Sequence, residues 1–393
     1  MLKTLRSCSW LVFFLMSSLS FSQPPANQIK VKPDILIGMT VPLSGELKLV
    51  GVGEKEGVEV VFKKVNAEGG IDGRKLKLIA LDDYYDPIRA GKNVRELVNK
   101  DHIFAFLGNM GSATSLVTLP IILNNKILLF APVTGNEIYR KNPPDHYVFN
   151  LRASLREEVD SLIQIALSKG VKPNEFALFI QNDSFGNAVY DGAIKAFKKL
   201  GYPNPEDLPV GRFNRMTVNV EDALATIIPE QKVKIKAFIL GGNFVSNANF
   251  IKLAKQEFPD AIFLSVSGRI DPSNLDKKDE KNIIVTQLVP YYNADLPGIK
   301  QYRDDLTKYA NGIKPSFENL EGYLSAKIFV MVLKKAAIKN NLTTEGVIDA
   351  LESMQHIDLG INQDIMFNKY HHNGLNITWP MVIENKQFIP FKK

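Results

Sequence analysis

The sequence predicts an α/β protein built from two open, mainly parallel sheets, each covered by helices. Segments typical of strands and of helices alternate from residue 35 onward, which is the pattern of a parallel sheet with crossover helices. The alternation restarts near residue 147, so two such units follow each other. A chain of 393 residues is long enough to bury two cores.

The first unit begins with a buried apolar strand and an amphipathic helix. Apolar residues from Val58 to Val65 recur at helical spacing, and Gly69-Gly70 ends this helix. The expected strands are Ile35–Val41, Leu76–Leu81, Ile103–Leu107 and Ile127–Ala131, and the expected helices are Glu54–Ala67, Pro87–Asn99 and Ser115–Leu123.

The second unit repeats the alternation and runs into a more helical stretch. A strand over Tyr147–Leu151 leads into it. The expected helices are Leu155–Ser168, Ala188–Leu200, Val220–Ile228, Asn247–Gln256, Ile299–Tyr309, Asn319–Ala337 and Thr344–Met354. The expected strands are Phe176–Ile180, Ile235–Leu240, Ala261–Val266, Ile283–Leu288 and a final hairpin of Thr378–Ile383 with Gln387–Ile389.

The N-terminus has the order of a secretory signal peptide. Lys3 and Arg6 precede the apolar run of residues 10–16, and Ser20-Phe21-Ser22 supplies a small-x-small cleavage site before Gln23. A buried N-terminal helix is the alternative, but two prolines follow at once. The single cysteine, Cys8, lies within residues 1–22, so the mature chain would have no disulfide, thiolate nucleophile or cysteine metal ligand.

Composition argues for a soluble protein without nucleic-acid affinity. The formal net charge is +6, and charges of both signs are interspersed along the chain. Without a dense basic block, an ordinary solvated surface is the better reading than a nucleic-acid interface. No later segment is apolar over the length needed to span a bilayer.

Ligands of such sheets bind at the carboxyl ends of the strands, in the loops that lead into helices. The loop after Leu107 contains Asn109, Ser112 and Thr114, whose polar groups at a helix N-terminus suit a carboxylate or phosphate. The alternative is a plain N-cap, in which a hydroxyl satisfies only its own helix.

Three further loops contain candidate ligand contacts. Val133-Thr134-Gly135 follows another strand, and Gly135 either allows a ligand close to the backbone or only forms a turn. Phe185 is an aromatic wall of the site or a core residue. Asn243 and Arg269 follow later strands, and an exposed Arg269 without a ligand contact is the alternative there.

Catalytic and metal-binding motifs are not evident. Gly51, Gly53 and Gly57 do not have the dinucleotide-binding spacing, and there is no Walker motif and no G-x-S-x-G elbow. Asp82-Asp83 would point to opposite faces of a strand, which favours a cap or hinge role over acid–base catalysis. His371-His372 diverge similarly, and we expect them on the surface without a metal. No cofactor is indicated.

An ordered set of motifs is similar to the leucine/isoleucine/valine-binding protein family of periplasmic receptors for ABC importers. The resemblance covers nearly all of the mature chain. The motifs are Pro42-Leu43-Ser44-Gly45, the run Asn66-Ala67-Glu68-Gly69-Gly70-Ile71-Asp72-Gly73-Arg74, Asp82-Asp83, Asp86-Pro87, Gly108 with Ser112, Ala131-Pro132, Asp183 with Phe185-Gly186, and Gly241-Gly242.

The resemblance implies two Rossmann-like lobes joined by three hinge strands, a type I periplasmic binding protein that closes on its ligand. Residues 1–22 would be the signal peptide, 33–150 plus 285–367 the N-terminal lobe, and 151–284 plus 368–393 the C-terminal lobe. Ser112, Val133 and Gly135 match positions that hold an amino acid's carboxylate. Phe185 matches an aromatic wall position, and Val50 and Asn243 match positions that are often aromatic.

One departure from the family bears on the ligand. The amino-acid binders have an acid after the strand that ends near Val266, to pair the ligand's ammonium group. Here Ser267, Gly268 and Arg269 stand there. Because a desolvated ammonium needs an acidic partner, we expect a ligand other than a standard amino acid, such as a carboxylate paired with Arg269.

The expected function is capture of a small amino-acid-like or carboxylate solute and its delivery to an ABC importer, by a monomer in the periplasm. The same closed form could instead signal through a membrane sensor. A hydrolase on the same scaffold is disfavoured, because no nucleophile–base set is evident.

Overall fold

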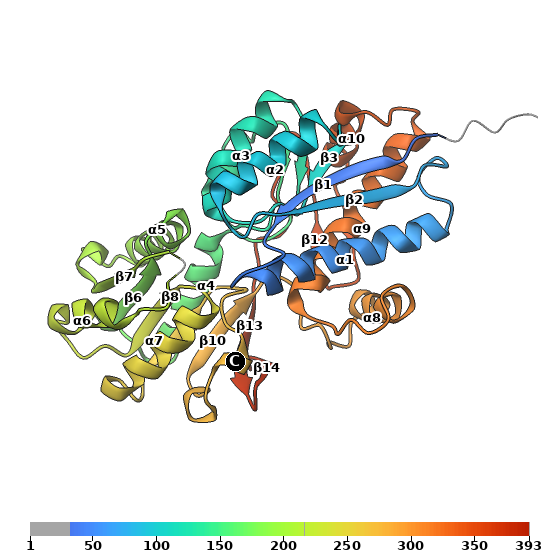
Figure 1. Ribbon diagram of the computed structural model, residues 1–393. Helices are drawn as coiled ribbons and strands as arrows, with labels where there is room; N and C mark the ends of the chain where they lie inside the picture. Colours follow the sequence, from blue (N-terminus) through green and yellow to red (C-terminus); the bar gives the residue numbers. More distant parts are fainter. Residues whose placement is uncertain (1–31, 216, 393) are drawn as a thin grey trace, which may run out of the picture. The chain divides into compact units, whose positions relative to one another are not determined.

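The computed structural model describes residues 32–215 and 217–392, and the expected signal peptide over residues 1–22 lies outside them. Pro33–Lys393 form one compact unit. Figure 1 shows its two large sheets, each with its own helices. Among the described residues, no helix is both long and apolar enough to cross a membrane.

The first sheet has five parallel strands in the order β2-β1-β3-β4-β5. The strands are β1 (Ile35–Val41), β2 (Leu76–Asp82), β3 (Ala105–Leu107), β4 (Leu128–Phe130) and β5 (Val148–Phe149). The crossover helices are α1 (Lys48–Ala67), α2 (Pro87–Asn99) and α3 (Ser112–Asn124). Helices α2 and α3 cover one face, and α1 covers the other with α9 from later in the chain.

The second sheet has seven strands in the order β14-β13-β10-β9-β8-β6-β7, of which β10 to β7 run parallel. The strands are β6 (Phe176–Gln181), β7 (Val210–Phe213), β8 (Ala237–Gly241), β9 (Ile262–Ser265), β10 (Ile283–Gln287), β13 (Trp379–Glu384) and β14 (Gln387–Pro390). The helices are α4 (Leu155–Ser168), α5 (Ser184–Lys199), α6 (Glu221–Glu230) and α7 (Phe244–Glu257). Helices α4 and α5 pack on one face, and α6 and α7 on the other.

The chain passes between the two sheets more than once. After β10 it leaves the second sheet and forms helices that pack beside α1, and it then returns for β13 and β14. These helices are α8 (Pro297–Tyr309), α9 (Phe317–Ile338) and α10 (Thr344–Glu352), followed by the two-stranded sheet of β11 (Ile357–Asp358) and β12 (Asp364–Ile365). Figure 1 shows α1 and α9 side by side across the first sheet.

The expected two-sheet α/β architecture is confirmed, but several elements differ from the sequence prediction. Strand β5 pairs with β4 and so completes the first sheet, rather than opening the second. Strand β7 and the β11–β12 pair were missed, because such short segments carry little periodicity. Helices α1, α3, α5 and α7 all begin three to six residues earlier than their apolar patterns indicate.

The packing of α1 depends on its glycines. Glycine lowers helix propensity, yet α1 includes Gly51, Gly53 and Gly57. Of these, Gly53 and Gly57 allow α9 to approach closely. A Cβ at Gly57 would lie 2.1 Å from the carbonyl oxygen of Asn319, and one at Gly53 would lie 2.6 Å from Cβ of Glu318. Close helix packing therefore outweighs the local propensity.

Candidate functional site

The loops at the carboxyl ends of β1, β3, β4 and β9 meet the start of α9 around one pocket. Residues from both sheets line it, as the strand-end rule predicts. The lining residues are Val50, Met110, Val133, Arg152, Ser267, Gly268, Arg269, Gln287, Leu288, Val289, Phe317, Glu318 and Glu321.

Arg269 is a buried cation of this pocket. Its residue is 7% exposed, so the exposed alternative was wrong. The guanidinium carbon lies 4.1 Å from the ring centroid of Phe185 and 5.9 Å from that of Tyr85. Within the described part of the chain, no carboxylate lies within ion-pair distance of Arg269, and its Nη1 has no hydrogen-bond partner. A buried guanidinium in this state favours an anion beside it.

Arg152 is a second arginine of the same pocket, and it is fully paired. Its Nε and Nη2 each donate to a carboxylate oxygen of Glu321 at 2.7 Å. Arg152 lies between β5 and α4, where the chain passes to the second sheet, and Glu321 lies on α9. The fork-to-fork geometry is the strongest form of an ion pair. This pair therefore ties the connecting segment to the helix of the first sheet.

Glu318 and Glu321 are acidic residues of the pocket that the sequence argument missed. Both come from the first turns of α9, far along the chain from the strand-end loops that contain the predicted candidates. Glu321 is paired with Arg152, whereas Glu318 is not in an ion pair with any described residue. Burial raises the pKa of Glu318, and the neighbouring Glu321 raises it further. The pocket therefore contains acidic residues, although none follows β9.

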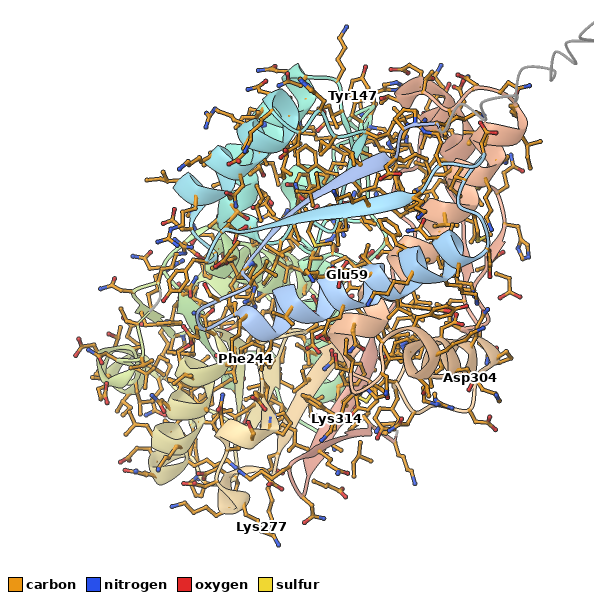
Figure 2. The ribbon with its side chains drawn as sticks, turned by 45° about the vertical axis from the view of Figure 1, so that its right-hand side comes forward. Glu59, Tyr147, Phe244, Lys277, Asp304 and Lys314 are labelled. Carbon is orange, nitrogen blue, oxygen red and sulfur yellow. The ribbon has the colours of Figure 1, made fainter. Side chains whose placement is uncertain are left out.

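A larger groove adjoins the pocket at Glu318. It is lined by the first turns of α1, by Phe244 at the start of α7, and by Lys314 before α9. Phe244 and Lys314 are labelled in Figure 2, where both lie below α1. Phe244 also belongs to the core cluster that contains Val50, so α7 packs against the first unit.

The loop before α3 uses most of its hydroxyls internally. Thr114 Oγ1 donates to the carbonyl of Gly111 at 3.0 Å, and Ser112 Oγ bonds Thr134 Oγ1 at 2.9 Å. The N-cap is Gly111, without a side-chain cap, so the plain hydroxyl N-cap is not observed. Asn109 Oδ1 accepts from the amide of Thr40 at 3.1 Å, while its Nδ2 is buried without a partner.

Val133 lines the pocket, whereas Gly135 packs against the backbone at the start of α4. A Cβ at Gly135 would lie 2.4 Å from the amide nitrogen of Leu155, which donates to the Gly135 carbonyl at 2.9 Å. The close approach that glycine allows here is therefore made by the first residue of α4. Val50 lines the opposite part of the pocket and is 3.6 Å from a Cβ built on Gly268.

Phe185 and Asn243 lie beside the pocket, outside its lining. Phe185 is buried in the core on the α4–α5 face and also stacks on Arg269, so its core role is confirmed, whereas a contact with the ligand stays a prediction. Asn243 Nδ2 donates to Gln181 Oε1 at 2.9 Å and to Glu46 Oε2 at 3.4 Å. Because Glu46 follows β1 and Gln181 ends β6, Asn243 links the two units.

Glu158 on α4 supports the loop that carries Arg269. Its Oε2 accepts from the amide of Ser267 at 2.7 Å and from the hydroxyl of Thr286 at 2.8 Å. Burial raises the pKa of Glu158, and these hydrogen bonds with the nearby Arg152 lower it. No sequence motif singles out this residue, because a glutamate in the first turn of a helix is ordinary there.

Asp82 and Asp83 shape a turn and have separate partners. Asp82 Oδ1 accepts from the amides of Leu43 and Tyr84 at 2.8 and 3.0 Å. Asp83 accepts from the hydroxyl of Thr40 at 2.9 Å and from the amide of Tyr85 at 2.8 Å. The two carboxylates diverge, as expected.

His372 corrects the expectation of two surface histidines. It is 3% exposed, its ring stacks on Phe149 at 3.7 Å, and its Nδ1 bonds the carbonyl of Val148 at 2.9 Å. His371 is exposed. Adjacent residues of an extended segment point to opposite sides, so one of them is buried against β5. Within residues 32–215 and 217–392, no group of three metal-ligating side chains occurs.

Similar proteins agree with this architecture. The Leu/Ile/Val-binding protein homolog 2 of Brucella abortus (strain 2308) is 25% identical over 237 residues, which is 60% of this chain and 61% of that relative, less than two thirds of its length. A possible leucine/isoleucine/valine-binding protein of Rhodopirellula baltica SH 1 is 30% identical with a TM-score of 0.86, covering 93% of this chain and 98% of that one.

A branched-chain amino acid ABC transporter protein of Thermus thermophilus with bound valine shares the fold, with a TM-score of 0.77 at 21% identity over 92% of this chain and 96% of that one. The family model for periplasmic binding proteins matches residues 34–385. The chain therefore belongs to the periplasmic binding protein family, with the leucine/isoleucine/valine-binding proteins among its relatives, and is a binding protein rather than an enzyme.

Proposed function

We propose that the protein captures a small carboxylate-bearing solute between its two lobes and delivers it to an ABC importer. The single observation that carries the ligand class is Arg269, a buried guanidinium without a carboxylate partner in the described chain. A ligand carboxylate supplies the missing charge and accepts a fork of hydrogen bonds.

Other groups in and beside the pocket are compatible with such a ligand. Arg269 lines the pocket and has a buried Nη1 without a partner, and Asn109, next to the lining residue Met110 in the chain, has a buried Nδ2 without one. Val50, Met110 and Val133 give the remainder of the ligand an apolar surface. Glu318 also lines the pocket and is able to pair with an ammonium group. The proposed ligand is therefore defined by its carboxylate, and amino-acid-like ligands are included.

Closure follows from the placement of these groups. Val133 belongs to the first lobe and Arg269 to the second, and both line the pocket, so a ligand that contacts both favours the closed form. For the lobe boundaries we retain residues 33–150 plus 285–367 and 151–284 plus 368–393. We also propose a periplasmic monomer whose first 22 residues are removed.

The importer role is supported by the relatives. The protein of similar fold from Thermus thermophilus is described as a branched-chain amino acid ABC transporter with bound valine. Its likeness shows the fold alone, so its ligand is not transferred to this chain. Export to the periplasm is tested by N-terminal sequencing of the protein recovered from that compartment, which should begin at Gln23.

The ligand class is tested by calorimetry on protein that has been unfolded and refolded to remove any bound solute. Each carboxylate of an aliphatic and aromatic panel is paired with its own primary amide, and leucine, isoleucine and valine are included. We expect binding of a carboxylate and not of its amide. Arg269→Met should weaken this binding at least tenfold, since a hydrogen bond to a charged group contributes about 1.5–3 kcal/mol.

Arg95→Met is the matched control, because Arg95 is exposed on α2 and outside the pocket lining. It should bind as the unmodified protein does. Equal binding of a carboxylate and its amide, or unchanged affinity in Arg269→Met, would contradict the proposal. Tight binding of leucine, isoleucine or valine would show that an ammonium is accepted, and Glu318→Gln would then identify its partner.

A further inference from the structure

A strained turn after β2 directs Tyr85 into the interior. Tyr84 and Tyr85 both have left-handed backbones, with φ of 55° and 59°, which side chains with a Cβ rarely adopt. The carboxylates of Asp82 and Asp83 hold the turn by accepting the amides of these two tyrosines. Such strain persists where the surrounding structure fixes a side chain in a functional position.

The side chain of Tyr85 lies where the two lobes meet. Its ring packs on the loop before α3, since a Cβ at Gly111 would lie 2.4 Å from the ring. From the second lobe, the guanidinium carbons of Arg215 and Arg269 lie 4.9 and 5.9 Å from the ring centroid. Arg215 also donates to the Tyr85 carbonyl. Met110, which precedes Gly111 in the chain, lines the pocket. Because the ring of Tyr85 packs on Gly111, it lies directly behind this part of the pocket wall.

The phenol hydroxyl is the unexplained part of this arrangement. Tyr85 is 1% exposed, and its Oη has no hydrogen-bond partner in the described chain. A buried hydroxyl without a partner is destabilising, and phenylalanine would fill the same space without that cost. Burial raises the pKa of Tyr85, while the charges of Arg269 and Arg215 and a side-chain contact of the hydroxyl with Arg269 lower it, so the group is neutral at physiological pH. Because a guanidinium can only donate, the proton of the hydroxyl is left for another acceptor.

We propose that Tyr85 is a ligand-binding residue, whose hydroxyl donates to the same carboxylate that Arg269 binds. The inference rests on the proposed function and adds a residue from a loop outside the pocket lining. One ligand group would then be held by a neutral donor of the first lobe and a cation of the second. Because neither lobe alone supplies both donors, the bound carboxylate itself joins the lobes. Asp83 acts as a positioning residue, through its bond to the Tyr85 amide.

The conservative variant Tyr85→Phe tests the hydroxyl directly. We expect it to weaken binding of the carboxylate identified above by about tenfold or more, because a hydrogen bond to a charged acceptor is lost. Without ligand, the variant should unfold at the same or a higher temperature. Combined with Arg269→Met, the loss should be less than the product of the two single losses, since both donors serve one group.

Two matched controls separate binding from packing. Tyr84→Phe alters the neighbouring tyrosine, which is 43% exposed, and Tyr139→Phe alters another buried hydroxyl without a partner, in the core on the α2–α3 face. Both should bind normally. If Tyr85→Phe keeps its affinity within about twofold while Arg269→Met loses it, the Tyr85 proposal is wrong and the proposed function stands. If the unmodified protein binds no carboxylate, both fall together.

Discussion

Two buried arginines line the same pocket, and their surroundings differ completely. Arg152 forms two 2.7 Å hydrogen bonds with Glu321, with 12% and 13% of the side-chain surfaces exposed. Arg269 stacks on Phe185 and faces no carboxylate at ion-pair distance among the described residues. The first arginine is satisfied by the fold, whereas the second has no such partner. Burial of a charge alone therefore does not separate a structural arginine from a candidate ligand contact, and the missing carboxylate partner is what makes Arg269 the candidate that we propose.

The largest effect is expected where the satisfied pair is broken. Arg152→Met leaves the Glu321 carboxylate buried without its cation, which should lower the free energy of unfolding by about 3–5 kcal/mol. Urea denaturation of the ligand-free protein measures this.

The double variant Arg152→Met/Glu321→Met provides the control for this loss. Replacing both members of a buried pair by apolar residues is often neutral, so it should recover most of the stability that the single variant loses. A double variant as unstable as Arg152→Met would mean that packing, rather than charge pairing, accounts for the loss.

Asp82 and Asp83 are neighbouring carboxylates whose surroundings also differ, and their pKa values shift in opposite directions. Hydrogen bonds from Ser44 and three backbone amides outweigh partial burial and lower the pKa of Asp82. Burial raises the pKa of Asp83 to about 7, against hydrogen bonds from Tyr85 and Thr40, and the adjacent Asp82 and Asp86 raise it too. Asp83 therefore binds its proton more tightly in the folded state than in the unfolded state.

This shift predicts a pH dependence of stability. The contribution of Asp83 is present below its unfolded pKa of 3.8 and is lost as the pH rises through about 7. Over that range Asp83→Asn should remove a decline of roughly 4 kcal/mol in the free energy of unfolding. Urea unfolding at a series of pH values, compared with the unmodified protein, measures the difference. Parallel curves for the two proteins would show that folding does not shift the pKa of Asp83.

The sequence predicted the architecture because the signals for it are repeated many times. Alternating strands and helices occur in every part of both units, and single errors such as the late start of α1 do not change the topology. The loops that surround the pocket were also predictable, since strand order brings the carboxyl ends of parallel strands together. Val50, Val133 and Arg269 therefore appeared among the candidates and line the pocket.

The partners of those residues could not be predicted, because tertiary contacts determine them. Glu321 and Glu318 reach the pocket from α9, and their spacing within that helix does not distinguish them from solvent-facing acids. The same holds for Tyr85, whose turn has no pattern that indicates its inward direction. Gly135 is a candidate whose neighbour is not a ligand. The sequence allowed either a ligand or a plain turn there, and in the structure the backbone of Leu155 lies against this glycine.

The smallest stability effect is expected at the unsatisfied arginine, and it is the sharpest test of the contrast. Arg269→Met removes a buried charge, which is stabilising, and the carboxylate whose pKa Arg269 lowers, Glu46, is only partly buried, so the ligand-free protein should lose no more than about 1 kcal/mol of unfolding free energy. The lost stacking on Phe185 costs about 0.5–2 kcal/mol, which the removal of the charge and the new apolar packing partly offset. Urea denaturation of Arg269→Met and Arg152→Met side by side shows which substitution lowers the free energy of unfolding more. If Arg269→Met were as unstable as Arg152→Met, Arg269 would be a structural residue, and the case for a ligand carboxylate would lose its main support.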